Sequence, residues 1–188
     1  MHFDRLSASK VSLEEFCSCM ERLNENELLW QYAIISIHNS LQGYITAGLS
    51  RDNILDTWKE KQAKKWKKEF DLKLQGLNDP ELPQLDYFNE LFNKAFVNES
   101  TIDGGLIKYL NDLRNSFIHF NTGVLALEKD FAISVCNEAI KAISLIPAIF
   151  TEIFYYEQEE NQFKELCLKA EKLISHQEQL NKKIKRTV

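Results

Sequence analysis

Apolar residues recur every three or four positions along most of this chain, which is the spacing of one face of an α-helix. The first such run follows Ser12, which stands three residues before Glu15 as in a capping box, so residues 1–11 are expected to be a loose lead-in. The pattern predicts helices over residues 12–23, 27–49, 53–74, 85–96, 104–121, 131–156 and 163–184, with Pro147 kinking or splitting the sixth. Only six Gly and three Pro interrupt the chain. We therefore expect an all-α protein, a helical bundle of about five to seven helices with a long C-terminal helix.

The helix expected over residues 27–49 is apolar on nearly every side, which is typical of a central helix in a bundle. Three polar residues, His38, Asn39 and Gln42, interrupt it. One interpretation is that they are hydrogen-bonded polar groups near the core. The other is that His38 or Asn39 faces the polar residues of a later helix as a supporting shell. A chain of 188 residues has the length of one domain, with a core bundle over 25–156 and a heptad-patterned helix over 157–188.

The C-terminal segment has the most regular pattern. Its apolar stripe alternates steps of three and four and contains Phe163, Leu166, Ala170, Leu173, Gln177, Leu180 and Ile184. Such a stripe packs either along the bundle or against a second chain, as in a coiled coil. The polar Gln177 and the short length, three heptads, favour packing along the bundle.

The helix expected over residues 104–121 combines an apolar seam with a polar cluster. The seam consists of Leu106, Leu110, Leu113, Phe117 and Phe120. Successive helical residues turn by about 100°, which places Arg114 and His119 about 140° apart with Asn115 between them. All three are expected to point away from the seam. An arginine, an amide and a histidine on one outward face are more than solubility requires, so this cluster is the candidate site.

Cleavage of RNA suits these residue types. The 2′-hydroxyl of RNA is a built-in nucleophile, and its attack needs proton transfer and positive donors for the phosphoryl oxygens. A histidine transfers protons near neutral pH, and an arginine grips two phosphate oxygens through its planar fork. Asn115 would orient the histidine or donate to the phosphate, and no metal or other cofactor is required. One histidine and one arginine are few groups to provide both the general acid and the general base. Two copies of the chain that meet on a twofold axis would bring two histidines and two arginines to one cleft.

The pair Arg114-Asn115 followed by His119 resembles the Arg-x4-His signature of the HEPN superfamily. The segment Tyr32–Gln42 is similar to the apolar helix that comes early in many bacterial HEPN domains, so the resemblance extends over residues 25–156. It implies a HEPN-like fold and a metal-independent endoribonuclease, a toxin or phage-defence component. Because HEPN ribonucleases build their sites between two domains, it also implies a homodimer, with RNA as the substrate and an antitoxin protein as a further partner. In the HEPN toxins silenced by nucleotidylation, a Tyr lies two residues beyond the His; here that residue is Asn121, so control at this position is not implied.

Two alternatives stay open beside the ribonuclease. Many HEPN-like domains are binding or scaffold modules, so the chain would then be a non-catalytic dimerisation or nucleotide- or protein-binding module. At the level of the residues, Arg114 would pair with an acid on a neighbouring helix while His119 is an ordinary exposed polar residue.

Charge is unevenly distributed. The net charge of −5 argues against a basic surface made for bulk nucleic-acid binding. Residues 51–75, however, hold eight basic and five acidic residues, and a stripe of four lysines lies beside Trp58 and Trp66: Lys61, Lys64, Lys65 and Lys68. The stripe predicts a nucleic-acid-binding surface assisted by stacking. The alternative is a solvated helix face whose tryptophans belong to the core.

The remaining features favour a reduced, cytoplasmic protein. Cys17 and Cys19 are too close for a Cys-x2-Cys metal site and no histidine lies nearby, so all four cysteines are expected to be free thiols. Residues 1–10 carry charges and no apolar core, unlike a signal peptide. The most apolar run, residues 131–156, is interrupted by charges and Pro147, which predicts a buried helix rather than a membrane span.

Overall fold

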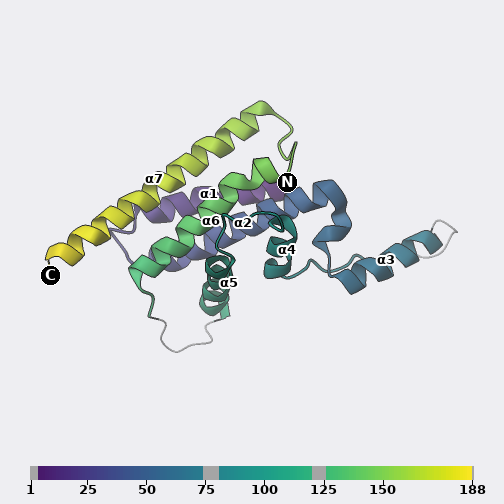
Figure 1. Ribbon diagram of the computed structural model, residues 1–188, viewed down its shortest axis with the longest axis horizontal. Coiled ribbons are helices and arrows are strands. Elements are labelled where there is room, and N and C mark those ends of the chain that lie inside the picture. Colours follow the sequence, from purple (N-terminus) through teal and green to yellow (C-terminus); the bar gives the residue numbers. More distant parts are fainter. Residues whose placement is uncertain (1–3, 74–80, 120–125, 188) are drawn as a thin grey trace.

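The computed structural model describes residues 4–73, 81–119 and 126–187. Within these ranges the chain forms seven α-helices and one short 3₁₀ helix and contains no β-strand (Figure 1). The elements are α1 (Arg5–Glu21), α2 (Leu29–Asn53), η1 (Ile54–Thr57), α3 (Glu60–Lys73), α4 (Phe88–Ala95), α5 (Gly104–His119), α6 (Lys129–Ile149) and α7 (Glu157–Thr187). The predicted all-α class and long C-terminal helix are confirmed for the described residues.

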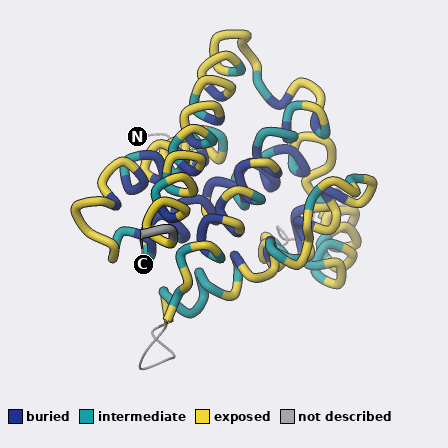
Figure 2. The backbone as a smooth tube through the Cα atoms, turned by 60° about the vertical axis from the view of Figure 1, so that its left-hand side comes forward, coloured by how far each residue is buried: buried dark blue, intermediate teal, exposed yellow. Residues whose placement is uncertain are grey.

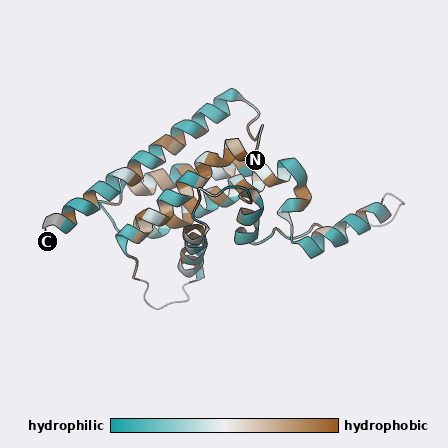
Figure 3. Cartoon of the chain, in the orientation of Figure 1, coloured by the Kyte–Doolittle hydropathy of each residue, from teal (hydrophilic) through white to brown (hydrophobic). Residues whose placement is uncertain are grey.

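The core surrounds α2 and α6. α2 packs against α1, α4, α5 and α6, while α7 covers α1 and α6. The buried residues form one continuous apolar cluster, and Figure 2 shows them in the middle of the bundle with exposed residues around it. Figure 3 shows the same contrast in hydropathy, because α3 and much of α7 are hydrophilic. The expected central helix is thus confirmed as α2.

α1 begins seven residues earlier than expected, at Arg5 instead of Ser12. Asp4 caps it: its side chain accepts hydrogen bonds from the Ser7 hydroxyl at 2.6 Å and from the Ser7 backbone N–H at 2.8 Å. These bonds hold the pKa of the Asp4 carboxyl below its usual value. Ser12 lies inside the helix and donates to the Ala8 carbonyl. The predicted lead-in was wrong because Asp4 is as good an N-cap as Ser12 and comes first.

The predicted helix over residues 53–74 is interrupted near its start. The Asn53 side chain accepts a hydrogen bond from the Leu55 N–H at 3.2 Å and begins η1. The chain then becomes extended at Trp58, which forms an isolated antiparallel bridge with Leu85. α3 starts only at Glu60 and points away from the bundle (Figure 1). A pairing between residues so far apart in the sequence has no local signal, which is why the break was not predicted.

We call residues 57–73 together with 81–86 the arm. The Asp86 N–H donates to the Thr57 carbonyl at 2.9 Å, and the Gln84 N–H donates to the Gln62 side chain at 2.7 Å. Trp66 lies edge-on to the buried Trp58 and stacks on Phe70, with ring centroids 5.2 and 4.7 Å apart. Trp58 and Trp66 therefore stabilise the arm itself instead of lying ready to stack on bases.

α6 contains Pro147 without being split by it. The helix ends at Ile149, earlier than the predicted Tyr156, and the Phe150 N–H donates to the Ile146 carbonyl at 2.9 Å. Pro147 falls in the last turn, where its missing N–H leaves only one earlier carbonyl without a helical partner. By length and composition α6 is apolar enough to cross a membrane, and half of its most apolar stretch is buried inside the bundle. The cytoplasmic location stays a prediction.

α7 packs along the bundle, which is the alternative that its sequence favoured. Its buried residues are Phe163, Cys167, Ala170, Ile174 and Asn181, whereas most other members of the predicted stripe are half-buried and Ile184 is 55% exposed. α7 contacts both α1 and α6, so its inward face is shifted and broader than a two-helix seam. Lys169 adds an ion pair with Glu21 on α1 at 2.8 Å.

The four cysteines are free thiols, as predicted, and the structure shows that all four are buried. Burial raises the pKa of the Cys17 thiol to about 11 and that of Cys136 and Cys167 to about 12. Thiols held in the protonated form are poor nucleophiles and poor metal ligands. Their role here is to fill the core.

Candidate functional site

α5 is fixed at its N-terminal end by Asp103. The Asp103 carboxylate accepts hydrogen bonds from the backbone N–H groups of Gly105 at 2.8 Å and Leu106 at 3.2 Å. The Asp103 N–H in turn donates to Glu138 of α6 at 2.7 Å. Because α5 also packs against α2, α4 and α6, its faces have a defined orientation relative to the bundle. His119 is its last residue; Phe120, Asn121 and the predicted cap at Gly123 lie outside the described residues.

The inward face of α5 is broader than the predicted seam and includes Arg114. Ile107 and Leu110 are fully buried, while Leu106, Leu113 and Phe117 are half-buried. Arg114 follows Leu110 by one turn and Ile107 by two, so it shares their face. Its side chain is half-buried, and its Nε is buried without a hydrogen-bond partner among the described residues. The expectation that Arg114 points outward with His119 was wrong, because Ile107 extends the packed face past the seam.

His38 of α2 faces α5 from inside the bundle. Its Nε2 lies 3.1 Å from Oδ1 of Asn111, and its ring centroid lies 4.3 Å from that of Phe88 on α4. The side chain is only 1% exposed. Nδ1 has no partner among the described residues, so the tautomer with its proton on Nε2 satisfies the ring best. His38 is therefore a buried polar group that joins α2 to α5.

The charge state of His38 follows from its surroundings. Burial, opposed by the hydrogen bond with Asn111 and assisted by the nearby positive charge of Arg114, lowers the pKa of His38 to about 4. The imidazole is therefore neutral at pH 7 and suits a structural role better than proton transfer. Asn39, the next residue, is exposed. Of the two predicted supporting residues, only His38 lies beside the Arg114 region.

Arg114 and His119 have different environments. Arg114 Nη1 donates to Oδ1 of the neighbouring Asn115 at 3.0 Å. Within the described part of the chain Arg114 forms no ion pair, so the alternative in which it pairs with an acid on a neighbouring helix is not observed. His119 is exposed, and none of the described residues donates to or accepts from its imidazole. Asn115 therefore orients an uncompensated guanidinium, and His119 faces solvent.

The predicted lysine stripe lies elsewhere, on the arm. Lys61, Lys64, Lys65 and Lys68 are all exposed on α3. Lys64 pairs with Glu60, and Lys65 lies 3.5 Å from Glu69. α3 packs chiefly on η1, and Figure 1 shows α4 between the arm and α5. The structure thus does not bring the stripe into contact with the Arg114 region.

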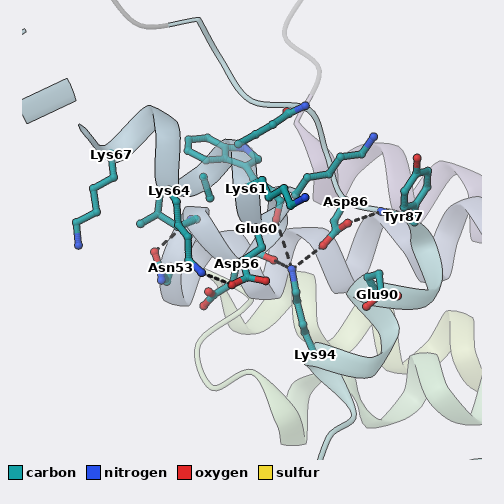
Figure 4. A pocket seen from close by; sticks show the side chains of 15 residues that line it. Asn53, Asp56, Glu60, Lys61, Lys64, Lys67, Asp86, Tyr87, Glu90 and Lys94 are labelled. Carbon is teal, nitrogen blue, oxygen red and sulfur yellow. Dashed lines mark hydrogen bonds and ion pairs between the residues drawn. The ribbon is translucent and has the colours of Figure 1, made fainter. Parts of the chain in front are cut away.

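A groove of about 740 Å³ lies at the base of the arm, between α3 and the start of α4 (Figure 4). Its lining includes Lys59, Lys61, Lys64, Lys67, Tyr87 and Lys94. Lys59 lies 4.4 Å from the centroid of the Tyr87 ring, and Lys94 bonds Asp86 at 2.8 Å. Sequence reasoning missed this groove and the Asn111 partner of His38, because both depend on contacts between distant segments.

The described residues contain no group of three His, Cys, Asp or Glu side chains close enough together to bind a metal ion. In comparisons with models of protein families, with curated proteins and with solved structures, no match to this chain was found. The HEPN-like identity therefore stays a prediction from the motif that includes Arg114 and His119.

Proposed function

We propose that this protein is a metal-independent endoribonuclease of HEPN type, a cytoplasmic toxin or phage-defence component. The observation that carries the proposal is on α5. An exposed His119 imidazole shares the helix with an Arg114 guanidinium that Asn115 orients and no carboxylate of the described residues neutralises. An uncompensated guanidinium and a solvent-facing imidazole are groups suited to a polyanionic substrate.

The proposed reaction needs only the substrate and these side chains. The 2′-hydroxyl of one nucleotide attacks the adjacent phosphorus, and the bond from phosphorus to the 5′ oxygen of the next nucleotide breaks. One His119 accepts the hydroxyl proton and a protonated His119 returns a proton to the leaving oxygen, a contribution worth about 10²–10⁴ in rate. Arg114 stabilises the charge on the phosphoryl oxygens. The products end in a 2′,3′-cyclic phosphate and a 5′-hydroxyl.

A homodimer supplies what one protomer lacks. Arg114 and His119 lie about 140° apart around α5, so one helix does not direct both groups to a single phosphate. Two copies of α5 facing each other across a twofold axis place the Arg114 of one protomer near the His119 of the other. Within this shared site the His119 that accepts the hydroxyl proton becomes the acid that returns a proton to the leaving oxygen, so one histidine acts as base and then as acid.

The test uses purified protein and single-stranded RNA in EDTA. We expect cleavage with 2′,3′-cyclic phosphate ends, and His119→Ala should abolish it without lowering the melting temperature, because His119 is exposed. The matched control is His176→Ala, which removes an exposed histidine from α7 and should leave cleavage unchanged. If cleavage persists in His119→Ala, or if it needs a divalent metal, this assignment is wrong.

A second candidate is a non-catalytic dimerisation or nucleotide- or protein-binding module. The inward position of Arg114 favours it, because a buried Nε ties the guanidinium to the packing of α5. This candidate predicts no RNA cleavage at any protein concentration. Deleting α7 is a poor test of dimerisation, since it would remove the buried Phe163 and Ala170 and expose the faces of α1 and α6 that α7 covers. Leu168→Glu is better, because Leu168 is 53% exposed; a change in oligomeric mass would favour the module.

A further inference from the structure

The arm differs in charge from the rest of the molecule. Residues 59–73 contain seven lysines and three carboxylates, whereas the whole chain has a net charge of −5. Residues 59–73, with seven positive and three negative charges, are therefore a strongly positive element on an acidic bundle, while Glu81 and Asp86 lower the excess of the whole described arm. In Figure 1 it projects from the bundle, so its field is not masked by neighbouring helices.

Lys61, Lys64, Lys65 and Lys68 lie on the side of α3 away from its aromatic residues, and Lys67 lies on the flank between them. Trp66 and Phe70 lie on the side that packs on Trp58. The outer face presents Lys61, Lys64, Lys65, Lys67 and Lys68, all exposed. Of these five, Lys64 pairs with Glu60 and Lys65 with Glu69, whereas Lys61, Lys67 and Lys68 form no ion pair with any described residue.

The groove at the base of the arm shares Lys61, Lys64 and Lys67 with the outer face of α3. Five lysines line it, but so do the carboxylates of Asp56, Glu60, Asp86 and Glu90. Lys64 and Lys94 are already paired with two of these carboxylates (Figure 4). A small anion in the groove would meet nearly balanced charge. The ligand indicated is instead an extended polyanion along the outer face of α3.

The base of the arm fixes the direction of this face. The backbone bonds from Asp86 to Thr57 and from Lys59 to Gln84 hold the two segments together at 2.9 and 3.3 Å. Lysines presented by a helix on a fixed base lose less freedom on binding than lysines on a loose loop. Lys61, Lys64 and Lys68 lie on successive turns, with a pitch of about 5.4 Å, so they form a row.

We propose that the outer face of α3 binds the phosphate backbone of single-stranded RNA and holds the strand that α5 cuts. The choice of RNA among polyanions rests on the proposed ribonuclease function. α4 contacts both η1, at the base of the arm, and α5, so the arm and the α5 cluster are linked by packed elements. The lysines act here as binding residues; His119 and Arg114 remain the catalytic ones.

The experiment measures binding separately from cleavage. The probe is a fluorescent single-stranded RNA whose 2′-hydroxyls are methylated, so it lacks the nucleophile and stays intact. Binding is followed by anisotropy between about 50 and about 200 mM salt. The arm variant carries Lys61→Gln, Lys67→Gln and Lys68→Gln. The control carries Lys164→Gln, Lys172→Gln and Lys182→Gln on α7, which removes the same charge from exposed positions.

The arm variant should bind at least about 10-fold more weakly, and its plot of log affinity against log salt should be shallower by about 2, since each phosphate contact contributes about 0.7. The control should bind nearly as the wild type does, and both variants should keep their helical circular dichroism. The proposal is overturned if the wild type does not bind the probe or if both variants bind equally. It is also overturned if the arm variant changes oligomeric mass while its RNA affinity is unchanged.

The same assay separates this proposal from the ribonuclease. If the wild type cleaves ordinary RNA but the arm variant binds the probe as tightly as the wild type does, the arm proposal is wrong and the ribonuclease proposal stands. If the wild type binds the probe through the arm but does not cleave ordinary RNA, the ribonuclease proposal is wrong and α3 is a surface that binds single strands.

Discussion

α2 and α3 are consecutive long helices of this chain, and their polar residues lie in opposite environments. α2 is buried along most of its length, and Nε2 of its histidine, His38, bonds Asn111 of α5. α3 contacts little beyond η1 and leaves Lys61, Lys67 and Lys68 in solvent. Inside a bundle a polar side chain must find an internal partner, because an unpaired one costs about 1–3 kcal/mol. On the arm, the same kinds of residue remain free for an external ligand.

The largest expected effect distinguishes the two helices by their tryptophans. Trp30 of α2 is 7% exposed and lies in the core cluster. Trp30→Ala should lower the free energy of unfolding by about 3–5 kcal/mol, through lost apolar contacts and the cavity left behind. Urea denaturation measures it. A loss below about 1 kcal/mol would mean that α2 does not have the central position assigned to it.

His38 should make stability depend on pH. Its pKa is lowered to about 4 in the folded protein, whereas an unfolded histidine titrates near its ordinary value of 6.5. Between pH 4 and 6.5 the unfolded chain therefore binds one more proton than the folded protein does. The free energy of unfolding is highest above about pH 6.5 and falls by about 3 kcal/mol as the pH drops toward 4. His38→Gln keeps an N–H donor for Asn111 and should remove this slope. An unchanged slope in urea denaturation between pH 7 and pH 4.5 would show that other groups cause it.

A glycine in α2 tests how tightly the bundle closes. A Cβ on Gly48 would lie 2.3 Å from Cδ2 of Phe150, so Gly48→Ala should cost about 1–3 kcal/mol despite the better helix propensity of alanine. Gly104→Ala is the control, because the nearest atom to its Cβ is 4.0 Å away. That variant should be neutral or slightly stabilised in thermal unfolding. Equal effects at both positions would contradict the packing of Phe150 against α2.

The smallest expected effect is on the arm. Trp66→Ala should change the global free energy of unfolding by less than about 1 kcal/mol, because the arm can open without exposing the main core. Amide hydrogen exchange should instead accelerate along residues 60–73 and remain slow in α2. If Trp66→Ala destabilises the protein as much as Trp30→Ala does, the arm unfolds together with the bundle, and the expected difference between α2 and α3 is wrong.

Sequence patterns predicted the regions where local signals and packing agree. The apolar character of α2 and the seam of α5 predicted a central helix and a helix carrying Arg114, Asn115 and His119. α1 was predicted too short because Ser12 and Asp4 are both good caps and only the structure selects between them. The start of α3 was missed because the Trp58–Leu85 pairing is not local.

The candidate site was predicted as a set of residues but not as a geometry. We expected Arg114 to point outward, but it follows Leu110 of the seam by one turn, and Ile107 widens the packed face of α5 so that it includes Arg114. The partner of His38, Asn111, had no signal of its own, since the contact joins residues of two helices. Which side of an amphipathic helix is fully buried depends on how many helices pack against it, and that is a property of the fold.

The central claim is that Arg114 of one protomer and His119 of another act on the same phosphate. Mixing Arg114→Ala protein with His119→Ala protein tests it most directly, after each is shown to be folded and inactive alone. Random exchange makes half of the dimers mixed, and each mixed dimer has one intact shared site, so the mixture should regain about a quarter of wild-type cleavage. Wild-type protein that does not cut RNA in EDTA, or a mixture of exchanging dimers that stays inactive, would contradict the account.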